Sequence, residues 1–257
     1  MMLGNLWERI NGRYQRGTAE GLFKRPLAMR NREPLVTFTF DDFPSSAFRV
    51  GGAILRGHGA AGTYYAAFNL IGQESPVGMI FSREEVPLLL EEGHELGCHT
   101  FHHCNAWQTS PRVYRESIVE NLRAAEALHP GLRLKTHSYP IMCPRAFTKR
   151  WAGDMFDTCR GGGQCENRGT ADLNYLRSFF IERSFGRFDE IKRVVDRNVE
   201  GMGWLIFSTH DVTRSPTPYG CTPEYFERTV ACARESGARI ATMAEAYKTL
   251  LGDQPTA

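Results

Sequence analysis

The chain of 257 residues lacks any apolar run of the roughly 18 residues that a membrane-spanning helix needs. It also lacks an excess of one charge, because 31 Lys and Arg residues stand against 29 Asp and Glu residues. The net charge of +2, without a basic block, gives no reason to expect a nucleic acid or an anionic membrane as partner. A secretory signal is not recognisable either, since Glu8 and Arg9 interrupt the first apolar stretch.

Cysteine shows no ordered pattern. The count of seven is odd, and the spacings do not indicate a disulfide framework. Without an export signal, we expect mostly reduced thiols and a cytoplasmic protein. Cys159 and Cys165 flank the glycine run 161–163 and could pair, although a lone cysteine is more often a small core residue. Nothing in the sequence indicates the oligomeric state.

Strand-like and helix-like segments alternate beyond residue 33 with no linker or low-complexity segment between them. Such alternation is typical of one α/β domain with a parallel sheet. About seven units predict a TIM-like barrel, which could be incomplete or distorted, with a doubly wound open sheet as the competing architecture. We therefore divide the chain into a polar lead-in segment packed on the barrel, residues 1–33, and the barrel domain, residues 34–257.

Local patterns predict the individual elements. Strands are expected at 36–40, 63–68, 95–98, 132–138, 157–160, 203–208 and 239–242. Helices are expected at 48–58, 83–92, 111–129, 189–200 and 223–236, and from residue 243 onward. Ser82, Ser110 and Thr222 are the predicted N-caps, and Glu85 completes a capping box with Ser82. The apolar run 173–181 leaves strand and helix open.

Polar residues gather directly after the predicted strands. They are Asp41 and Asp42, His99, Ser138, Arg160, and His210 with Asp211. The carboxyl ends of parallel barrel strands converge on one face, where active sites are built. We therefore expect these side chains to lie close together.

Three of these residues have the chemistry of metal ligands. His99 and His103, four apart, would share one face of a helical turn and could bind one ion, whereas His102 breaks that spacing. Asp42 offers a carboxylate, although the Asp pair could instead be a turn that caps a helix near Ser45. Two imidazoles and one carboxylate leave open positions for water, as in a catalytic metal site.

Three segments resemble the motifs of the polysaccharide deacetylases, which are carbohydrate esterase family 4, or the NodB homology domain. Residues 39–42 resemble the first motif, residues 99–103 the second, H-[ST]-x-x-H, and residues 207–210 the final histidine motif. The order and spacing of the segments agree with the family, and the resemblance extends from about residue 34 to residue 247.

The resemblance implies a distorted (β/α)7 barrel and a bound divalent ion, Zn in the first place, with Co, Ni, Mn or Fe as alternatives. The implied roles are metal ligation by Asp42, His99 and His103, general base for Asp41, general acid for His210, and oxyanion or substrate binding for Tyr139, Pro140 and Ile141. A buried structural histidine is the alternative interpretation of His210.

The third motif departs from the family pattern. It often reads R-x-P-[FY], but here residues 138–141 read SYPI, so the arginine that would orient the base is missing. Arg160, at the next strand end, could supply this charge, or it could be an ordinary surface arginine. Asp157 and Asp172 are the candidates for the acid that tunes His210.

The predicted function is removal of an N-acetyl group from an amino sugar in a polysaccharide, glycolipid or nucleotide-sugar precursor. Without export, the expected substrates are nucleotide-linked or lipid-linked sugar precursors. Trp107, Tyr139 and Trp204 offer aromatic faces for a sugar ring, unless they are core residues. The alternatives are a related amidohydrolase acting on a non-sugar C–N bond and a catalytically silent carbohydrate-binding homologue.

Overall fold

The computed structural model describes residues 2–141 and 143–252. A parallel sheet curls into a barrel in the order β10 (Phe179–Phe180), β11 (Trp204–Thr209), β2 (Leu35–Phe40), β3 (Thr63–Ala66), β6 (Glu95–Cys98), β7 (Thr136–Ser138) and β8 (Thr158–Arg160). The edge strands β8 and β10 do not pair with each other; Arg160 instead bridges to Leu176. The predicted distorted (β/α)7 barrel in a single domain is thus confirmed.

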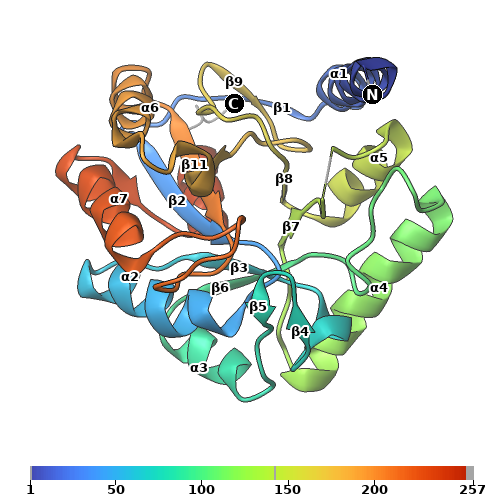
Figure 1. Cartoon of the computed structure of the whole chain (residues 1–257), viewed down its shortest axis with the longest axis horizontal. Helices are drawn as coiled ribbons and strands as arrows, with labels where there is room; N and C mark the ends of the chain where they lie inside the picture. Colours follow the sequence, from blue (N-terminus) through green and yellow to red (C-terminus); the bar gives the residue numbers. More distant parts are fainter. Residues whose placement is uncertain (1, 142, 253–257) are drawn as a thin grey trace.

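Helices surround the strands (Figure 1). They are α2 (Ala53–Gly57), α3 (Glu85–Glu91), α4 (Pro111–Leu128), α5 (Ala146–Met155), α6 (Phe188–Glu200) and α7 (Pro223–Glu235). The larger apolar core lies between strands and helices and includes Phe38 and Phe40. A smaller core joins Leu35 and Trp204, at the amino ends of their strands, to α8 (Met243–Gly252). Each fully buried side chain of this size contributes roughly 1.5–3 kcal/mol.

The sequence patterns located most strands and helix starts. The observed β2, β3, β6 and β11 lie within two residues of the predicted strands. The hydroxyls of Ser110 and Thr222 accept hydrogen bonds from the backbone N–H groups of Val113 and Tyr225, at 3.3 and 3.2 Å. These contacts satisfy N–H groups that the first turn of a helix leaves without a partner.

Other elements differ from the predictions. The helix expected at 48–58 begins as a π-helix, Ala47–Gly52, and the strand expected at 132–138 pairs only from Thr136. The sequence patterns did not locate α5 or the short hairpin of β4 (Glu74–Ser75) and β5 (Gly78–Met79). Within the undecided run 173–181, only its end forms a strand, β10.

The N-terminal segment contains elements that its polar composition concealed. Helix α1 (Met2–Gly21) is followed by β1 (Pro26–Ala28), which pairs antiparallel with β9 (Thr170–Asp172). Buried Lys149 of α5 donates to the carbonyl of Ala19 at 2.5 Å and to Asp172 at 2.6 Å, which ties helix and hairpin to the barrel. The domain division at residue 33 stays a prediction.

All seven cysteines are free thiols, so Cys159 and Cys165 do not pair. Within residues 2–141 and 143–252, no helix combines the length and apolarity needed to cross a membrane.

Candidate metal centre

The three predicted metal ligands meet at the carboxyl ends of β2 and β6. Nε2 of His103 lies 3.0 Å and Nε2 of His99 lies 3.4 Å from Oδ1 of Asp42. One ligand atom from each residue lies within 4.8 Å of the others, which is close enough for one ion. Burial raises the pKa of Asp42, but hydrogen bonds from His103 and His99, when these rings carry a proton on Nε2, outweigh burial and hold that pKa well below its usual range.

The contacts of His99 show that these groups fit a metal ion. Its Nδ1 lies 2.9 Å from the carbonyl oxygen of Ser138, which can only accept, so the neutral ring carries its hydrogen on Nδ1. Nε2 then directs a lone pair at Asp42 Oδ1, a buried oxygen without a well-formed hydrogen bond among the described residues. The lone pair of Nε2 and the carboxylate oxygen repel each other unless a cation lies between them. One carboxylate with two imidazoles is a ligand set that suits zinc and similar ions.

The expected helical turn between the two histidines is wrong. Residues 99–103 form a loop in which Thr100 and His103 have φ values of 57° and 50°. Asp42 and Ile141, two other predicted site residues, have φ values of 60° and 65°. Non-glycine residues rarely adopt this left-handed conformation, and such strain concentrates at functional sites. The loop backbone therefore brings the histidines together in a way that helical spacing does not.

The second carboxylate, Asp41, is held on both oxygens. Oδ1 accepts from Arg160 and, at 3.0 Å, from the hydroxyl of Ser138, while Oδ2 accepts from Ser208 at 3.3 Å. Burial raises the pKa of Asp41, but Arg160, His99 and His210 outweigh this and lower that pKa to about 2. Asp41 is therefore ionised near neutral pH.

Arg160 is a buried residue, so the surface interpretation is wrong. Only 1% of the residue is exposed, and the guanidinium lies 5.2 Å from the ring centre of Tyr65. Nη1 donates to Ser178 at 3.0 Å, and Nη2 reaches both Asp41 and Ser138. The guanidinium thus spans from β8 to the candidate base.

His210 follows β11, next to Asp41, whose backbone N–H donates to the carbonyl of Thr209 at 3.0 Å. Nδ1 of His210 lies 3.1 Å from the carbonyl of Tyr219, which fixes the hydrogen on Nδ1. Neither of the two acids predicted to tune His210, Asp157 and Asp172, occupies this position beside Nδ1. Asp172 pairs with Lys149, and Asp157 precedes β8 at the amino end of the sheet.

The three residues of the turn expected to bind the oxyanion differ in their exposure to solvent. Tyr139 is 6% exposed and donates its hydroxyl to the carbonyl of Asn174, and Pro140 is also buried. Ile141 is 62% exposed, and its backbone N–H has no hydrogen-bond partner within residues 2–141 and 143–252. Ile141 alone among the three can therefore offer a free donor.

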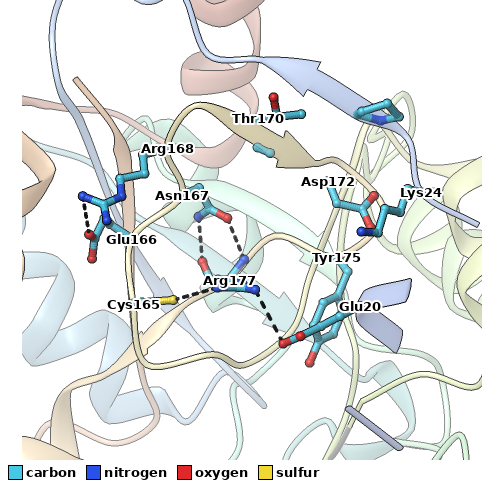
Figure 2. A pocket seen from close by; sticks show the side chains of 12 residues that line it. Glu20, Lys24, Cys165, Glu166, Asn167, Arg168, Thr170, Asp172, Tyr175 and Arg177 are labelled. Atoms are coloured by element: carbon cyan, nitrogen blue, oxygen red, sulfur yellow. Dashed lines mark hydrogen bonds and ion pairs between the residues drawn. The ribbon is translucent and has the colours of Figure 1, made fainter. Parts of the chain in front are cut away.

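A pocket of about 550 Å³ lies elsewhere, between the end of α1 and the β9 hairpin (Figure 2). None of its lining residues belongs to the metal centre. Its charged groups are largely paired: Arg177 lies 3.7 Å from Glu20, and Arg168 lies 3.9 Å from Glu166. The candidate site is therefore the cluster of Asp42, His99 and His103 and not this pocket.

Comparison with known families agrees with this site. Residues 28–146 match the family model described as polysaccharide deacetylase. The resemblance to the polysaccharide deacetylases is thereby confirmed. The matched residues include Asp42, His99 and His103 but end before Arg160 and His210. A comparison with curated proteins found no match.

Several solved structures share the deacetylase fold. A candidate polysaccharide deacetylase from Mycobacterium smegmatis aligns with a TM-score of 0.63 and 15% identity, over 91% of this chain and 96% of its own. A family 4 acetyl xylan esterase from Clostridium thermocellum, in complex with cobalt, gives 0.58 and 20%, over 85% and 92%. A family 4 pseudoenzyme from Bacillus anthracis gives 0.57 and 13%, over 84% and 66%. At these identities the likeness concerns the fold alone.

Three contributors to the site were missed by sequence reasoning. Ser178 and Ser208 hold Arg160 and Asp41, and the carbonyl of Tyr219 orients His210. Ser208 lies within the final histidine motif, residues 207–210, and could have been found there. The other two lie in irregular segments, which carry no signal in a single sequence.

Proposed function

We propose that this protein is a metal-dependent hydrolase that removes the N-acetyl group of an amino sugar. One observation carries the proposal: a carboxylate and two imidazoles that fit a metal ion lie beside a second carboxylate fixed by a buried arginine. Both groups lie at the carboxyl face of a barrel with the deacetylase fold, which is where barrel enzymes place their chemistry.

Asp42, His99 and His103 would hold the ion, and the carbonyl of Ser138 keeps His99 in the tautomer that binds metal. When bound, the ion supplies Lewis-acid chemistry, which acidifies water and polarises an amide carbonyl. Zinc suits this donor set best, and Co, Ni, Mn and Fe are compatible with it.

Asp41 would take the proton of the attacking water. Arg160 and Ser138 both bind Oδ1, whereas Oδ2 accepts only the weaker contact from Ser208 among the described residues. The carboxylate is thereby ionised and held in one orientation, with Oδ2 the less committed oxygen. A positioned base of this kind contributes typically 10²- to 10⁴-fold to the rate.

The remaining steps need an oxyanion donor and an acid. The free N–H of Ile141 can donate to the oxygen that becomes negative in the tetrahedral intermediate. As an imidazolium, His210 can give its Nε2 proton to the departing amine and is left as the neutral ring, whose Nδ1 hydrogen stays committed to the carbonyl of Tyr219.

Measurement of acetate release tests the proposal. The purified protein is incubated with N-acetylated sugars, glycolipid precursors and nucleotide sugars, with chelator and then with added Zn²⁺, Co²⁺, Ni²⁺ or Mn²⁺. We expect release from at least one member, loss with chelator, and recovery with metal. The Asp41→Asn variant is the matched control and should bind metal but release little acetate.

Other outcomes distinguish the alternatives. Release from O-acetylated xylan alone would indicate an esterase, which is the activity named for the Clostridium thermocellum protein. Release from non-sugar amides alone would indicate a different amidohydrolase. Metal and sugar binding without release from any substrate would indicate a silent homologue, and would overturn the proposal.

A further inference from the structure

The chain folds back on the candidate acid directly after β11. The carbonyl of Tyr219 accepts two hydrogen bonds from His210, one from the backbone N–H at 3.2 Å and one from ring Nδ1 at 3.1 Å. A single peptide group thus fixes both the backbone and the ring of His210. The orientation of the ring therefore depends on the contacts that hold this carbonyl in place.

Asp211, the residue after His210, holds the loop that carries this carbonyl. Asp211 is 3% exposed, and its Oδ1 accepts from the hydroxyl of Thr217 at 2.5 Å. Its Oδ2 accepts from the backbone N–H of Thr217 at 2.9 Å. The hydroxyl of Thr217 in turn accepts from the N–H of Tyr219 at 3.3 Å. The carboxylate of Asp211 is therefore connected to Tyr219 through one side chain.

The backbone closes the same loop around Asp211. The N–H of Cys221 donates to the carbonyl of Asp211 at 3.0 Å, and the N–H of Gly220 donates to the carbonyl of Thr217 at 3.1 Å. Glycine is required at residue 220, because a Cβ added there would lie 2.2 Å from Oδ1 of Asp211. Residues 211–221 thus form a closed loop that is built around one buried carboxylate.

The tautomer of His210 decides which nitrogen can act as the acid. A carbonyl oxygen can only accept, so the contact with Tyr219 keeps a hydrogen on Nδ1 in both the charged and the neutral ring. The proton that leaves the charged ring is then the one on Nε2, as the proposed function requires. Without this carbonyl the ring would be free to turn, and either nitrogen could lose its proton.

We propose that Asp211 is a positioning residue of the candidate acid. It acts through Thr217 and the carbonyl of Tyr219 to set the rotation and the tautomer of His210. Both carboxylate oxygens of Asp211 bind Thr217 and not the ring, so the effect passes through the loop. The inference rests on the proposed function, in which His210 is the acid.

The Thr217→Val variant tests the proposal, because it keeps the branched side chain and removes only the hydroxyl. We expect kcat on an N-acetylated sugar to fall about 3- to 10-fold with KM unchanged, which is the usual effect of one lost hydrogen bond. The fall should be smaller on an acetylated aromatic amine with an electron-withdrawing group, which needs less protonation to leave. Asp211→Asn turns one acceptor oxygen into a donor that faces Thr217, and should lower kcat about 10- to 100-fold.

Two further variants of the same loop are the controls, and circular dichroism checks the folding of all variants. Thr217→Ser keeps the hydroxyl and should behave like the unaltered protein. Ser215→Ala removes an exposed hydroxyl without a hydrogen-bond partner among the described residues, and should change neither kcat nor KM. An equal fall of kcat in Thr217→Val and Ser215→Ala would show a general effect of the loop and would overturn the positioning role.

The ring nitrogens of His210 give a second readout, independent of turnover. NMR of isotope-labelled histidine, at about pH 9, where histidine rings are neutral, shows which nitrogen carries the hydrogen. The signals of His210 are those that disappear in His210→Ala. We expect the hydrogen on Nδ1 in the unaltered protein and in Tyr219→Ala, which keeps the carbonyl. Thr217→Val and Asp211→Asn should show a mixture of both tautomers.

The outcomes separate this inference from the proposed function. A hydrogen that stays on Nδ1 in Thr217→Val and Asp211→Asn would overturn the positioning role and leave the hydrolase function intact. Loss of this tautomer in Tyr219→Ala would show that the ring of Tyr219, 5.7 Å from that of His210, holds the histidine, and would also overturn the role. If Thr217→Val and Asp211→Asn change the tautomer but the unaltered protein releases no acetate from any sugar, the positioning role stands and the hydrolase function fails.

Discussion

Arg160, the last residue of β8, donates to Oδ1 of Asp41, the residue after β2. The two strands are not neighbours in the sheet, so the guanidinium reaches across the barrel. In the third motif of the deacetylases an arginine often stands where this chain has Ser138. Ser138 here accepts from Arg160 and donates to Asp41, so a small residue leaves room for an arginine from another strand.

Replacing Arg160 by Met should therefore lower kcat about 100-fold or more with little change in KM, because Asp41 loses its orientation. Steady-state acetate release measures this. Since breaking a buried ion pair costs about 3–5 kcal/mol, folding is checked by circular dichroism. Ser178→Ala, which removes the contact to Nη1 and the hydrogen bond from the Ser178 hydroxyl to the carbonyl of Gly161, should fold normally and lose about 10-fold in kcat. Full activity in both variants would contradict a positioning role.

The arginine can also be placed at residue 138 instead of residue 160. The double variant Ser138→Arg with Arg160→Ser reproduces the arginine of the third motif as the family often has it, and we expect it to be more active than either single variant. Additive losses in the double variant would show that the two positions are not exchangeable.

Metal binding should stabilise the fold. At about 100 times its Kd, Zn²⁺ should raise the free energy of unfolding by about 2.7 kcal/mol, which corresponds to roughly 5–10 °C in Tm for a chain of this size. Differential scanning fluorimetry with and without chelator measures the shift. The shift should disappear in His103→Ala and persist in His102→Ala, since His102 faces Glu120 at 3.2 Å, away from Asp42. Equal shifts in both variants would refute the ligand assignment.

Replacement of His210 should lower kcat most for substrates with a poor leaving group. His210→Ala should lower kcat about 100- to 10,000-fold on an N-acetylated sugar, because the amine must be protonated to depart. The loss should be much smaller on an acetylated aromatic amine with an electron-withdrawing group, which leaves more easily. His58→Ala, far from the site, is the control. The same loss on both substrates would point to a structural role.

The barrel could be predicted because its signals are local. Strand β2 reads LVTFTF and is buried on both faces, and such runs can be recognised without a structure. Helix α1 could not be found in this way. Its sequence is polar, and its position depends on contacts such as that between Lys149 and Ala19, which lie 130 residues apart.

The candidate metal ligands and the residues that hold the site around them also differ in how well the sequence predicts them. Asp42, His99 and His103 follow strands in motif order, so sequence could nominate them. The loop geometry between His99 and His103 could not be inferred, because left-handed φ values at Thr100 and His103 are imposed by the surrounding fold. The link from Arg160 to Asp41 spans 119 residues, and a single sequence offers only the position of Arg160 at a strand end.

Buried His137 should make stability fall as the pH falls. Its Nδ1 lies 2.9 Å from the carbonyl of Cys98, its Nε2 lies 3.2 Å from the hydroxyl of Tyr114, and its ring stacks on Phe156. Burial, reinforced by the nearby positive charge of Arg160, lowers the pKa of His137 to about 3.

In the unfolded chain the pKa of His137 is near 6.5. Below that pH the unfolded state takes up a proton that the folded state refuses, so His137 should reduce the free energy of unfolding by up to about 1.4 kcal/mol per pH unit down to about pH 3. Other titrating groups, His103 among them, add their own slopes, so the comparison is made with His137→Phe, which keeps the aromatic ring. Urea unfolding between pH 6 and 4 should show a slope shallower by about 1.4 kcal/mol per pH unit in the variant. Parallel curves would mean that His137 takes up its proton equally in both states.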